Sequence, residues 1–341
     1  RDDSLWREIL EYYNSAIQIG MTATPKETRY ISNIEYFGDP VYTYSLKQGI
    51  EDGFLAPYKV IRVNLDKDVD GWRPYEGQRD DHGLLIDDYE YSSKDFDKVL
   101  ILDQRTQAVA KRISDWLKEN GRYLKTIVFC VDIEHAERMR QALVNENSDL
   151  VAENPWYVSR ITGDNPDARV LLDRFIDPSS VYPTVVTTSK LLTTGVDVQT
   201  CQLIVIDSVI NSVSEFKQII GRGTRIYLDQ NKYYFTILDF RKSTRLFADP
   251  EFDGAPIQIK DESENGEIEE ASESPQPADD ILTPEEELVQ IFPPTDSSRK
   301  PKYRLREVPV TFLNEQVQYI APNGKLTTES LRDFTKRNIL N

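Results

Sequence analysis

Gln218-Ile-Ile-Gly-Arg-Gly-Thr-Arg225, preceded at a short distance by Thr194-Gly-Val-Asp197, is the most informative stretch of this chain. Arg222 and Arg225 are three residues apart, a spacing that predicts one shared helix face. Guanidinium groups are planar and permanently charged, so they can stabilise charge on a transferring phosphoryl group without first taking up a proton. The alternative for this motif alone is a solvated basic helix end, where positive charge suits the helix dipole.

Apolar runs rich in Val and Ile predict a series of strands around this motif, at residues 58–66, 126–131, 157–162, 183–188, 202–207 and 233–239. Helices are expected between them, at 104–120, at 133–146 and after Asn165-Pro166. Ser212-x-x-Glu215 is a capping box for the helix that leads into the arginines. Strands that are apolar on both faces and alternate with helices are typical of a parallel sheet in an α/β fold.

Several segments occur in the order of the conserved helicase motifs III to VI, namely Ala16-Ile-Gln-Ile-Gly-Met-Thr-Ala-Thr-Pro25, Thr126-Ile-Val-Phe-Cys130, Val185-Val-Thr-Thr188, Gly195-Val-Asp197 and the arginine motif at 218–225. In this order the chain resembles superfamily 2 helicases and translocases. It is most similar to the motor subunit of type I restriction-modification enzymes, through Gly20-Met-Thr-Ala-Thr-Pro25, Ile50-Glu-Asp-Gly-Phe-Leu-Ala-Pro-Tyr58, and the segments 313–319 and 324–336. The resemblance implies a RecA-like lobe and ATP-dependent movement along double-stranded DNA. It also implies a cytoplasmic protein, with methyltransferase and specificity subunits as partners.

The resemblance also assigns roles to individual residues. Arg222 and Arg225 would contact the nucleotide, with Arg225 as the arginine finger, and Gln218 would position the phosphates. The cleft would be lined from this lobe by Gly195 and Asp197, and Thr22 and Thr24 would couple the nucleotide state to lobe movement. DNA phosphates would be contacted by Thr162, Gly163, Thr187, Thr188 and Ser189, with a basic rim from Arg160, Arg169 and Lys190. On local grounds, Thr22 and Thr24 could equally cap a strand end, and 187–189 could cap a short helix.

Two motifs that such a motor needs are not found in the sequence. No Gly-x-x-x-x-Gly-Lys-[Ser/Thr] loop occurs, and Asp2-Asp3 is too near the start to serve as the magnesium-binding acidic pair. Only nineteen residues precede Gly20, and the family order places both motifs before that point. We therefore expect ATP and Mg²⁺ to be bound mainly by a preceding lobe, and the chain alone to be inactive as an ATPase. No cluster of carboxylates with a nearby lysine indicates a nuclease.

The composition divides the chain into four expected regions. Residues 1–57 would end a first RecA-like lobe, 58–248 would form the second lobe, 249–301 an acidic flexible linker, and 302–341 the start of a helical C-terminal domain. Between 249 and 287 there are fifteen acids and one base, a net charge of −14 out of the −17 of the whole chain. Such a stretch buries too little apolar surface to fold, so a solvated spacer is favoured over a partner-binding or DNA-mimicking role.

Finer expectations concern local structure and cysteine. We expect a helix at 4–13, a short buried strand at 16–21, and a polar surface excursion at 67–96. Cys130 and Cys201 are expected to be buried packing residues, and His82 and His135 have no neighbouring ligand pattern, so no metal site is predicted. No apolar run approaches the roughly 18 residues of a membrane span.

Two other functions remain open from the sequence. The chain could belong to another superfamily 2 motor, such as a repair or type III restriction helicase, but its tail from Lys302 onward disfavours this. It could instead be a non-catalytic lobe that binds partners. The intact residues Gln218, Arg222 and Arg225 disfavour loss of activity.

Overall fold

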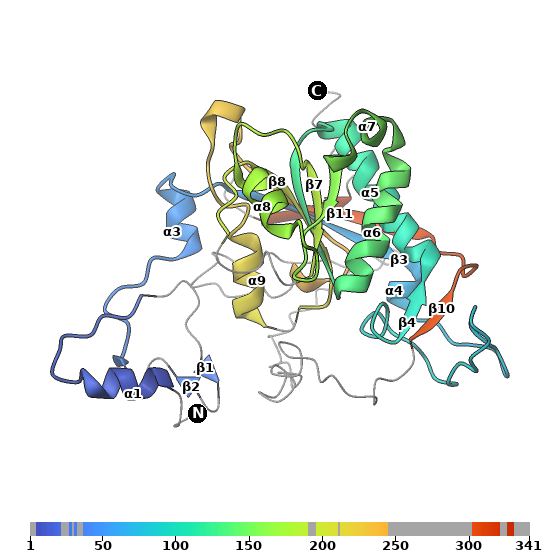
Figure 1. Ribbon diagram of the computed structural model, residues 1–341, viewed down its shortest axis with the longest axis horizontal. Coiled ribbons are helices and arrows are strands. Elements are labelled where there is room, and N and C mark those ends of the chain that lie inside the picture. The colour runs from blue at the N-terminus through green and yellow to red at the C-terminus, as the bar shows by residue number, and fades with distance from the viewer. Residues whose placement is uncertain are drawn as a thin grey trace.

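The computed structural model describes residues 5–21, 27–28, 31–32, 37–189, 196–210, 212–244, 302–320 and 326–330. The acidic linker expected at 249–301 lies outside this set. One large sheet organises the described residues, and helices lie on both of its faces (Figure 1). Among the described helices, none is both long and apolar enough to cross a membrane.

The large sheet has the strand order β12-β11-β3-β9-β8-β5-β7-β6. Six neighbouring strands are parallel: β3 (Tyr58–Leu65), β9 (Phe235–Asp239), β8 (Cys201–Asp207), β5 (Lys125–Cys130), β7 (Val185–Thr188) and β6 (Val158–Arg160). These are the six strands that the apolar runs predict, within about three residues at each end. The expected parallel α/β lobe is therefore confirmed.

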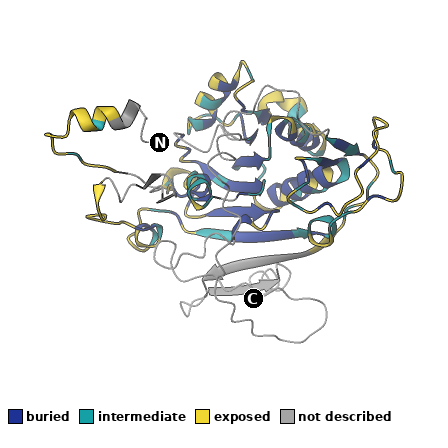
Figure 2. Ribbon diagram, turned by 90° about the horizontal axis from the view of Figure 1, so that it is seen from below, coloured by how far each residue is buried: buried dark blue, intermediate teal, exposed yellow. Residues whose placement is uncertain are grey.

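Helices α5 (Asp103–Asn120), α6 (Ile133–Glu146) and α7 (Ser148–Glu153) cover one face of the sheet, and α8 (Ala168–Ile176) and α9 (Val213–Ile220) cover the other. Neighbouring residues of β5 show how both faces are buried. Val128 and Cys130 pack on the first side, whereas Ile127 and Phe129 pack on the second. Most residues of the six parallel strands are accordingly buried, as Figure 2 shows. This two-sided burial explains why the strand sequences are apolar at almost every position.

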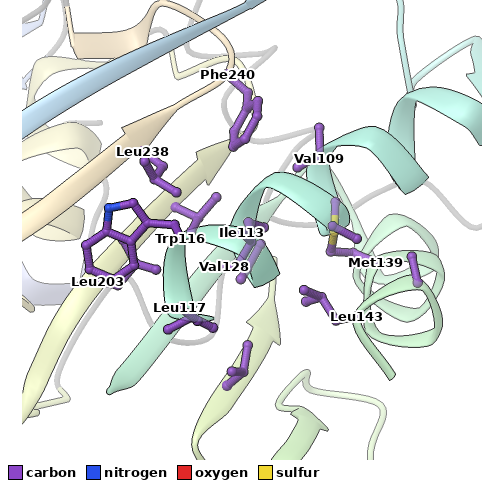
Figure 3. Packing of buried hydrophobic residues seen from close by; sticks show 14 of the residues in the cluster. Val109, Ile113, Trp116, Leu117, Val128, Met139, Leu143, Leu203, Leu238 and Phe240 are labelled. Atoms are coloured by element: carbon purple, nitrogen blue, oxygen red, sulfur yellow. The ribbon is translucent and has the colours of Figure 1, made fainter. Parts of the chain in front are cut away.

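The first core is built mainly from α5 and α6. Val109, Ile113 and Leu117 of α5 are fully buried, and they pack with Met139 and Leu143 of α6 over the sheet (Figure 3). Their spacing of three or four residues is the helical period that the sequence shows. Side chains of this kind contribute roughly 1.5–3 kcal/mol each when fully buried. Cys130 and Cys201 are buried in the two cores, as expected.

The N-terminal residues differ from the expectation. Helix α1 (Leu5–Tyr12) forms, but residues 16–21 are not a buried strand. Ile17, Ile19 and Met21 are almost fully exposed, at 95%, 82% and 93%. A strand requires partners for its backbone N–H and C=O groups, and no described strand lies beside this segment. Two short described strands, β1 (Glu27–Thr28) and β2 (Ile31–Ser32), pair only with each other, and α3 (Leu46–Glu51) follows.

The prediction of a helical domain from residue 302 onward is wrong for the described residues. They form β10 (Tyr303–Leu305), β11 (Phe312–Ile320) and β12 (Leu326–Ser330). β11 pairs antiparallel with β3, and β12 pairs antiparallel with β11, so the C-terminal residues extend the main sheet. The physical reason is that β3 pairs with β9 on one edge only, and β11 satisfies the backbone groups of its other edge.

The segment at 67–96 is more than a surface excursion. It begins with α4 (Asp66–Asp70) and leads to β4 (Leu100–Leu102), which pairs in parallel with β10. Tyr91 and Phe96 are buried at 0% and 1% exposure, in a small third core that includes Tyr303. The C-terminal strands thus hold this segment against the lobe. Trp72 and Tyr91 also form an isolated backbone bridge within it.

Candidate functional site

The arginine motif and Asp197 lie together at the amino ends of the parallel strands. Asp197 precedes β8, whereas α9 runs back along the sheet after β8 and ends just before Arg222. A hairpin-like turn then carries the chain from Arg225 to the start of β9. Residues that are far apart in sequence therefore meet at one end of the sheet.

The two arginines do not share a helix face, contrary to the expectation. Helix α9 begins with the predicted cap, in which the Ser212 hydroxyl accepts from the amide of Glu215 at 3.3 Å, but it ends at Ile220. The next residues form a turn. Gly223 packs closely in this turn, because a Cβ at this position would lie 2.3 Å from the ring of Phe235. A larger residue would therefore require the turn or the ring to shift.

The end of the motif pairs with the segment that precedes β3. Leu55 and Arg225 form an antiparallel bridge, and the amide of Ala56 donates to the carbonyl of Thr224 at 2.7 Å. The chain from 50 to 58 carries part of the sequence resemblance, and it lies directly beside the arginine motif in space. The backbone of Arg225 is thereby fixed from two sides, by Gly223 packing and by this pairing.

The side chain of Arg225 remains accessible. Its Nε lies 3.1 Å from Oδ1 of Asp197, and the two side chains are 55% and 54% exposed. Arg222 is half-buried, and burial lowers the pKa of its guanidinium, an effect that Asp197 opposes and Arg225 adds to. The Asp197 carboxylate therefore pairs directly with Arg225 and also acts electrostatically on Arg222. The result is an exposed cationic group with a surplus of positive charge, which suits an anionic ligand.

Other predicted nucleotide-site residues are only partly placed. Gln218 lies in the last turn of α9 and is half-buried. Thr22, Thr24 and Gly195 lie outside the described residues. The structure thus brings together Asp197, Arg222 and Arg225 from the predicted set, with Gln218 one turn earlier on the helix.

The predicted DNA-contacting residues lie at the opposite, carboxyl ends of β6 and β7. Gly163 is exposed and Ser189 is partly exposed. The hydroxyls of the three threonines face inward, since Thr162 donates to Asp164 at 2.6 Å, Thr187 donates to the Ala136 carbonyl at 2.9 Å, and Thr188 is fully buried. In this conformation only backbone groups and Ser189 would be accessible to a phosphate, and the DNA contacts remain a prediction.

The sequence patterns did not indicate a set of buried titratable side chains at the carboxyl ends of β8 and β9, here called the carboxyl-end charge cluster: Asp68, Asp97, Arg105, His135, Arg138, Asp207 and Arg241. Arg105 lies 2.8 Å from both Asp68 and Asp207, and Arg241 lies 2.9 Å from Asp207 and 2.7 Å from Asp97. Burial alone would raise the pKa of the Asp207 carboxyl, but Arg105 and Arg241 outweigh burial and hold it well below its usual range. The cluster joins α4, α5 and α6 to the sheet.

A signal for part of this cluster is present in the sequence. Asp207 ends one apolar strand, and Arg241 follows another strand, so in a parallel sheet both belong to the same edge. Asp68 follows the carboxyl end of β3 in the same way, whereas Asp97 carries no such signal because it lies in the irregular segment before β4.

The parallel sheet, the arginine motif after α9 and the match of residues 89–227 to the helicase conserved C-terminal domain define the class. Residues 89–227 are therefore a helicase C-terminal domain with a RecA-like α/β fold. Along 99% of its length it is 50% identical to the EcoAI endonuclease subunit, a type I restriction enzyme subunit of Escherichia coli. It is also 31% identical, over 69% of its length, to the EcoKI endonuclease subunit of Escherichia coli strain K12.

A solved structure agrees with these relatives. The fragment structure of an HsdR subunit of a type I restriction enzyme from Vibrio vulnificus YJ016 is 46% identical, with a TM-score of 0.61 over 75% of this chain and 45% of that chain. The predicted relationship to the motor subunits of type I restriction enzymes is confirmed. The chain spans 44% and 21% of the two curated relatives, which is less than half of either.

Proposed function

We propose that this chain is the C-terminal part of the motor in a type I restriction endonuclease subunit, where it takes part in ATP-dependent movement along double-stranded DNA. In this proposal the subunit works with methyltransferase and specificity subunits. Identity to endonuclease subunits along nearly the whole chain supports the assignment.

The observation that carries the proposal is the accessibility of Arg225. An exposed arginine–carboxylate pair contributes only about 0.2–1 kcal/mol, so its guanidinium can leave Asp197 for a ligand of higher charge at little cost. Its backbone is nevertheless fixed by pairing with Leu55 and by the close packing of Gly223 on Phe235. A rigid backbone with a displaceable side chain is what an arginine finger requires.

The nucleotide enters this proposal as a ligand shared with a preceding lobe. ATP supplies the phosphoryl group whose developing charge the arginines would stabilise, and Mg²⁺ would be bound mainly by that lobe. Within this chain, Arg225 and Arg222 would face the phosphates and Asp197 would orient Arg225 before the ligand arrives. The sequence contains no phosphate-binding loop with Gly-Lys-[Ser/Thr], so we expect no ATP hydrolysis from these 341 residues alone.

The test is Arg225→Ala in the complete subunit, assembled with its partners. We expect DNA-stimulated ATP turnover to fall by roughly 10³-fold or more, because arginine fingers contribute about 10³–10⁵ in rate. DNA binding, measured separately by fluorescence anisotropy at fixed salt concentration, should be largely retained.

Arg73→Ala is the matched control for this test. Arg73 also pairs with an aspartate through an exposed contact, at 2.8 Å from Asp88 and 63% exposed, but it lies in the segment before β4. Its loss should leave turnover near the wild-type value. Near-normal turnover in Arg225→Ala would contradict the assignment of Arg225 as the arginine finger.

A further inference from the structure

Lys232 is a buried lysine beside the arginine site, and no role follows for it from the arginine motif. It lies in the short turn between η2 (Leu228–Gln230) and β9, and its side chain is 1% exposed. Burying an ammonium group costs free energy unless it is well paired. A leucine would fill the same space without that cost, so the charge calls for an explanation.

The polar contacts of Lys232 connect two parts of the site. Its Nζ donates to the backbone carbonyl of Gln199 at 2.7 Å, two residues after Asp197. Its backbone pairs with Tyr227 in both directions, with N···O distances of 3.0 and 3.2 Å, two residues after Arg225. One residue therefore connects the loop that carries Asp197 to the hairpin that carries Arg225.

We propose that Lys232 is a positioning residue for the arginine finger, holding the Asp197 loop and the Arg225 hairpin at a fixed separation through its bond to Gln199. This inference rests on the proposed function, since it concerns how the finger is placed. Arg225 is held to Asp197 only by an exposed ion pair, which is too weak to fix the loop itself. The buried bond from Lys232 supplies the constraint that the exposed pair lacks.

The protonation of Lys232 gives the inference a distinctive signature. Burial lowers the pKa of its ammonium to about 8, while Asp197 acts to raise this pKa and Arg225 acts to lower it. The thiol of Cys201 is itself neutral near pH 8, because burial raises its pKa to about 11. The charged ammonium is thus present below about pH 8. As the pH rises through that value it becomes a neutral amine, whose bond to Gln199 is weaker because it lacks the charge. Finger placement should weaken over the same range.

The experiment compares pH profiles of DNA-stimulated ATP turnover in the complete subunit, from pH 6.5 to 10, for wild type, Lys232→Met and Lys232→Arg. Misplacing a reacting group by about 1 Å can cost roughly 10² in rate. We expect kcat of Lys232→Met to be roughly tenfold to a hundredfold lower at pH 7, with no alkaline decrease near pH 8 and a nearly unchanged KM. Lys232→Arg should recover turnover and move the alkaline decrease to higher pH.

Lys125→Met is the matched control. Lys125 is also buried, burial lowers its pKa to about 8, and it donates to the Pro183 carbonyl at 2.6 Å rather than to the Asp197 loop. This variant should keep the wild-type alkaline decrease, which would show that titration of a buried lysine elsewhere in the lobe does not cause it. Loss of that decrease in Lys125→Met would overturn the inference.

The two proposals fail in different ways. If Arg225→Ala abolishes turnover while both Lys232 variants keep the wild-type kcat and pH profile, the positioning role is wrong and the finger stands. If Lys232→Met does not fold, the positioning role is tested by comparing the pH profiles of wild type and Lys232→Arg. An alkaline decrease at the same pH in both proteins would contradict the inference. Normal turnover in Arg225→Ala would contradict both the arginine-finger assignment and the positioning role of Lys232.

Discussion

Arg225 and Arg105 both pair with an aspartate, at opposite ends of the same parallel strands, but in opposite surroundings. The Arg225–Asp197 contact is 3.1 Å long and both side chains are more than half exposed. The Arg105–Asp207 contact is 2.8 Å long and the side chains are 1% and 0% exposed. One arginine can exchange its partner for a ligand, whereas the other is locked in a network of three carboxylates.

The difference shows how placement is achieved at the two ends. At the carboxyl ends, side-chain charges hold α4, α5 and α6 to the sheet, and the arginines are part of the scaffold. At the amino ends, backbone packing at Gly223 and backbone pairing at Leu55 fix the chain and leave the Arg225 guanidinium available. Removing a charge should therefore destabilise the first end strongly and the second hardly at all.

The largest effect on stability is expected for Asp207→Asn. Its carboxylate contacts Arg105, Arg241 and His135, so the change leaves buried positive charge without its main partner. Breaking a buried pair in this way costs roughly 3–5 kcal/mol. We expect hydrogen exchange of amides in β8 and β9 to accelerate by roughly a hundredfold to several thousandfold, since 1.4 kcal/mol corresponds to about tenfold.

Asp149→Asn is the control for Asp207→Asn. Asp149 accepts from Arg122 at 2.8 Å, and its side chain is 60% exposed, so the same chemical change is made at the surface. Exchange in β8 and β9 should then be close to that of wild type. Equal effects of the two variants would show that burial does not distinguish these pairs.

An intermediate effect is expected for Gly223→Ala, which tests whether the backbone fixes the exposed end. The added Cβ would lie 2.3 Å from the Phe235 ring, so the turn or β9 must shift. Overpacking of this kind costs roughly 1–3 kcal/mol. Thermal unfolding should show the destabilisation, and ATP turnover should fall because Arg225 moves with the turn.

The exposed Gly163 provides the comparison for Gly223→Ala. A Cβ at Gly163 meets nothing within 4 Å, so Gly163→Ala should change stability little. If Gly223→Ala left both stability and turnover unchanged, the close approach to Phe235 would have no energetic consequence and the backbone argument would be wrong.

Local pattern predicted the six parallel strands and the main helices because burial on both faces leaves a clear apolar signal in each segment. The contiguous arginine motif placed Arg222 and Arg225 together, whereas Asp197 was grouped with them through the family resemblance, and the roles of these residues stay predictions. It could not predict the whole carboxyl-end charge cluster, since Asp97 reaches Arg105 and Arg241 only through the irregular path before β4. Nor could it predict that β11 pairs with β3, because this pairing joins residues about 250 positions apart.

The arginine geometry shows a second limit of sequence reasoning. The spacing of Arg222 and Arg225 fits a helix, but α9 ends at Ile220 and the motif continues as a turn in which Gly223 packs against Phe235. Side-chain spacing predicts a shared face only where the backbone stays helical. The backbone here is determined by packing against β9, which lies later in the chain.

The smallest effect on stability is expected for Asp197→Asn, which removes the charge of the exposed pair and keeps its shape. The change should alter the free energy of unfolding by less than about 1 kcal/mol, as is usual for exposed ion pairs. Turnover should fall less than in Arg225→Ala, because the finger loses its orienting partner but keeps its backbone position.

The matched variant is Asp88→Asn, since Asp88 is 64% exposed and pairs with Arg73 at 2.8 Å. Both variants should be equally stable, and only Asp197→Asn should lower turnover. A loss of several kcal/mol in Asp197→Asn would mean that the exposed pair is part of the scaffold, and the contrast between the two ends of the sheet would disappear.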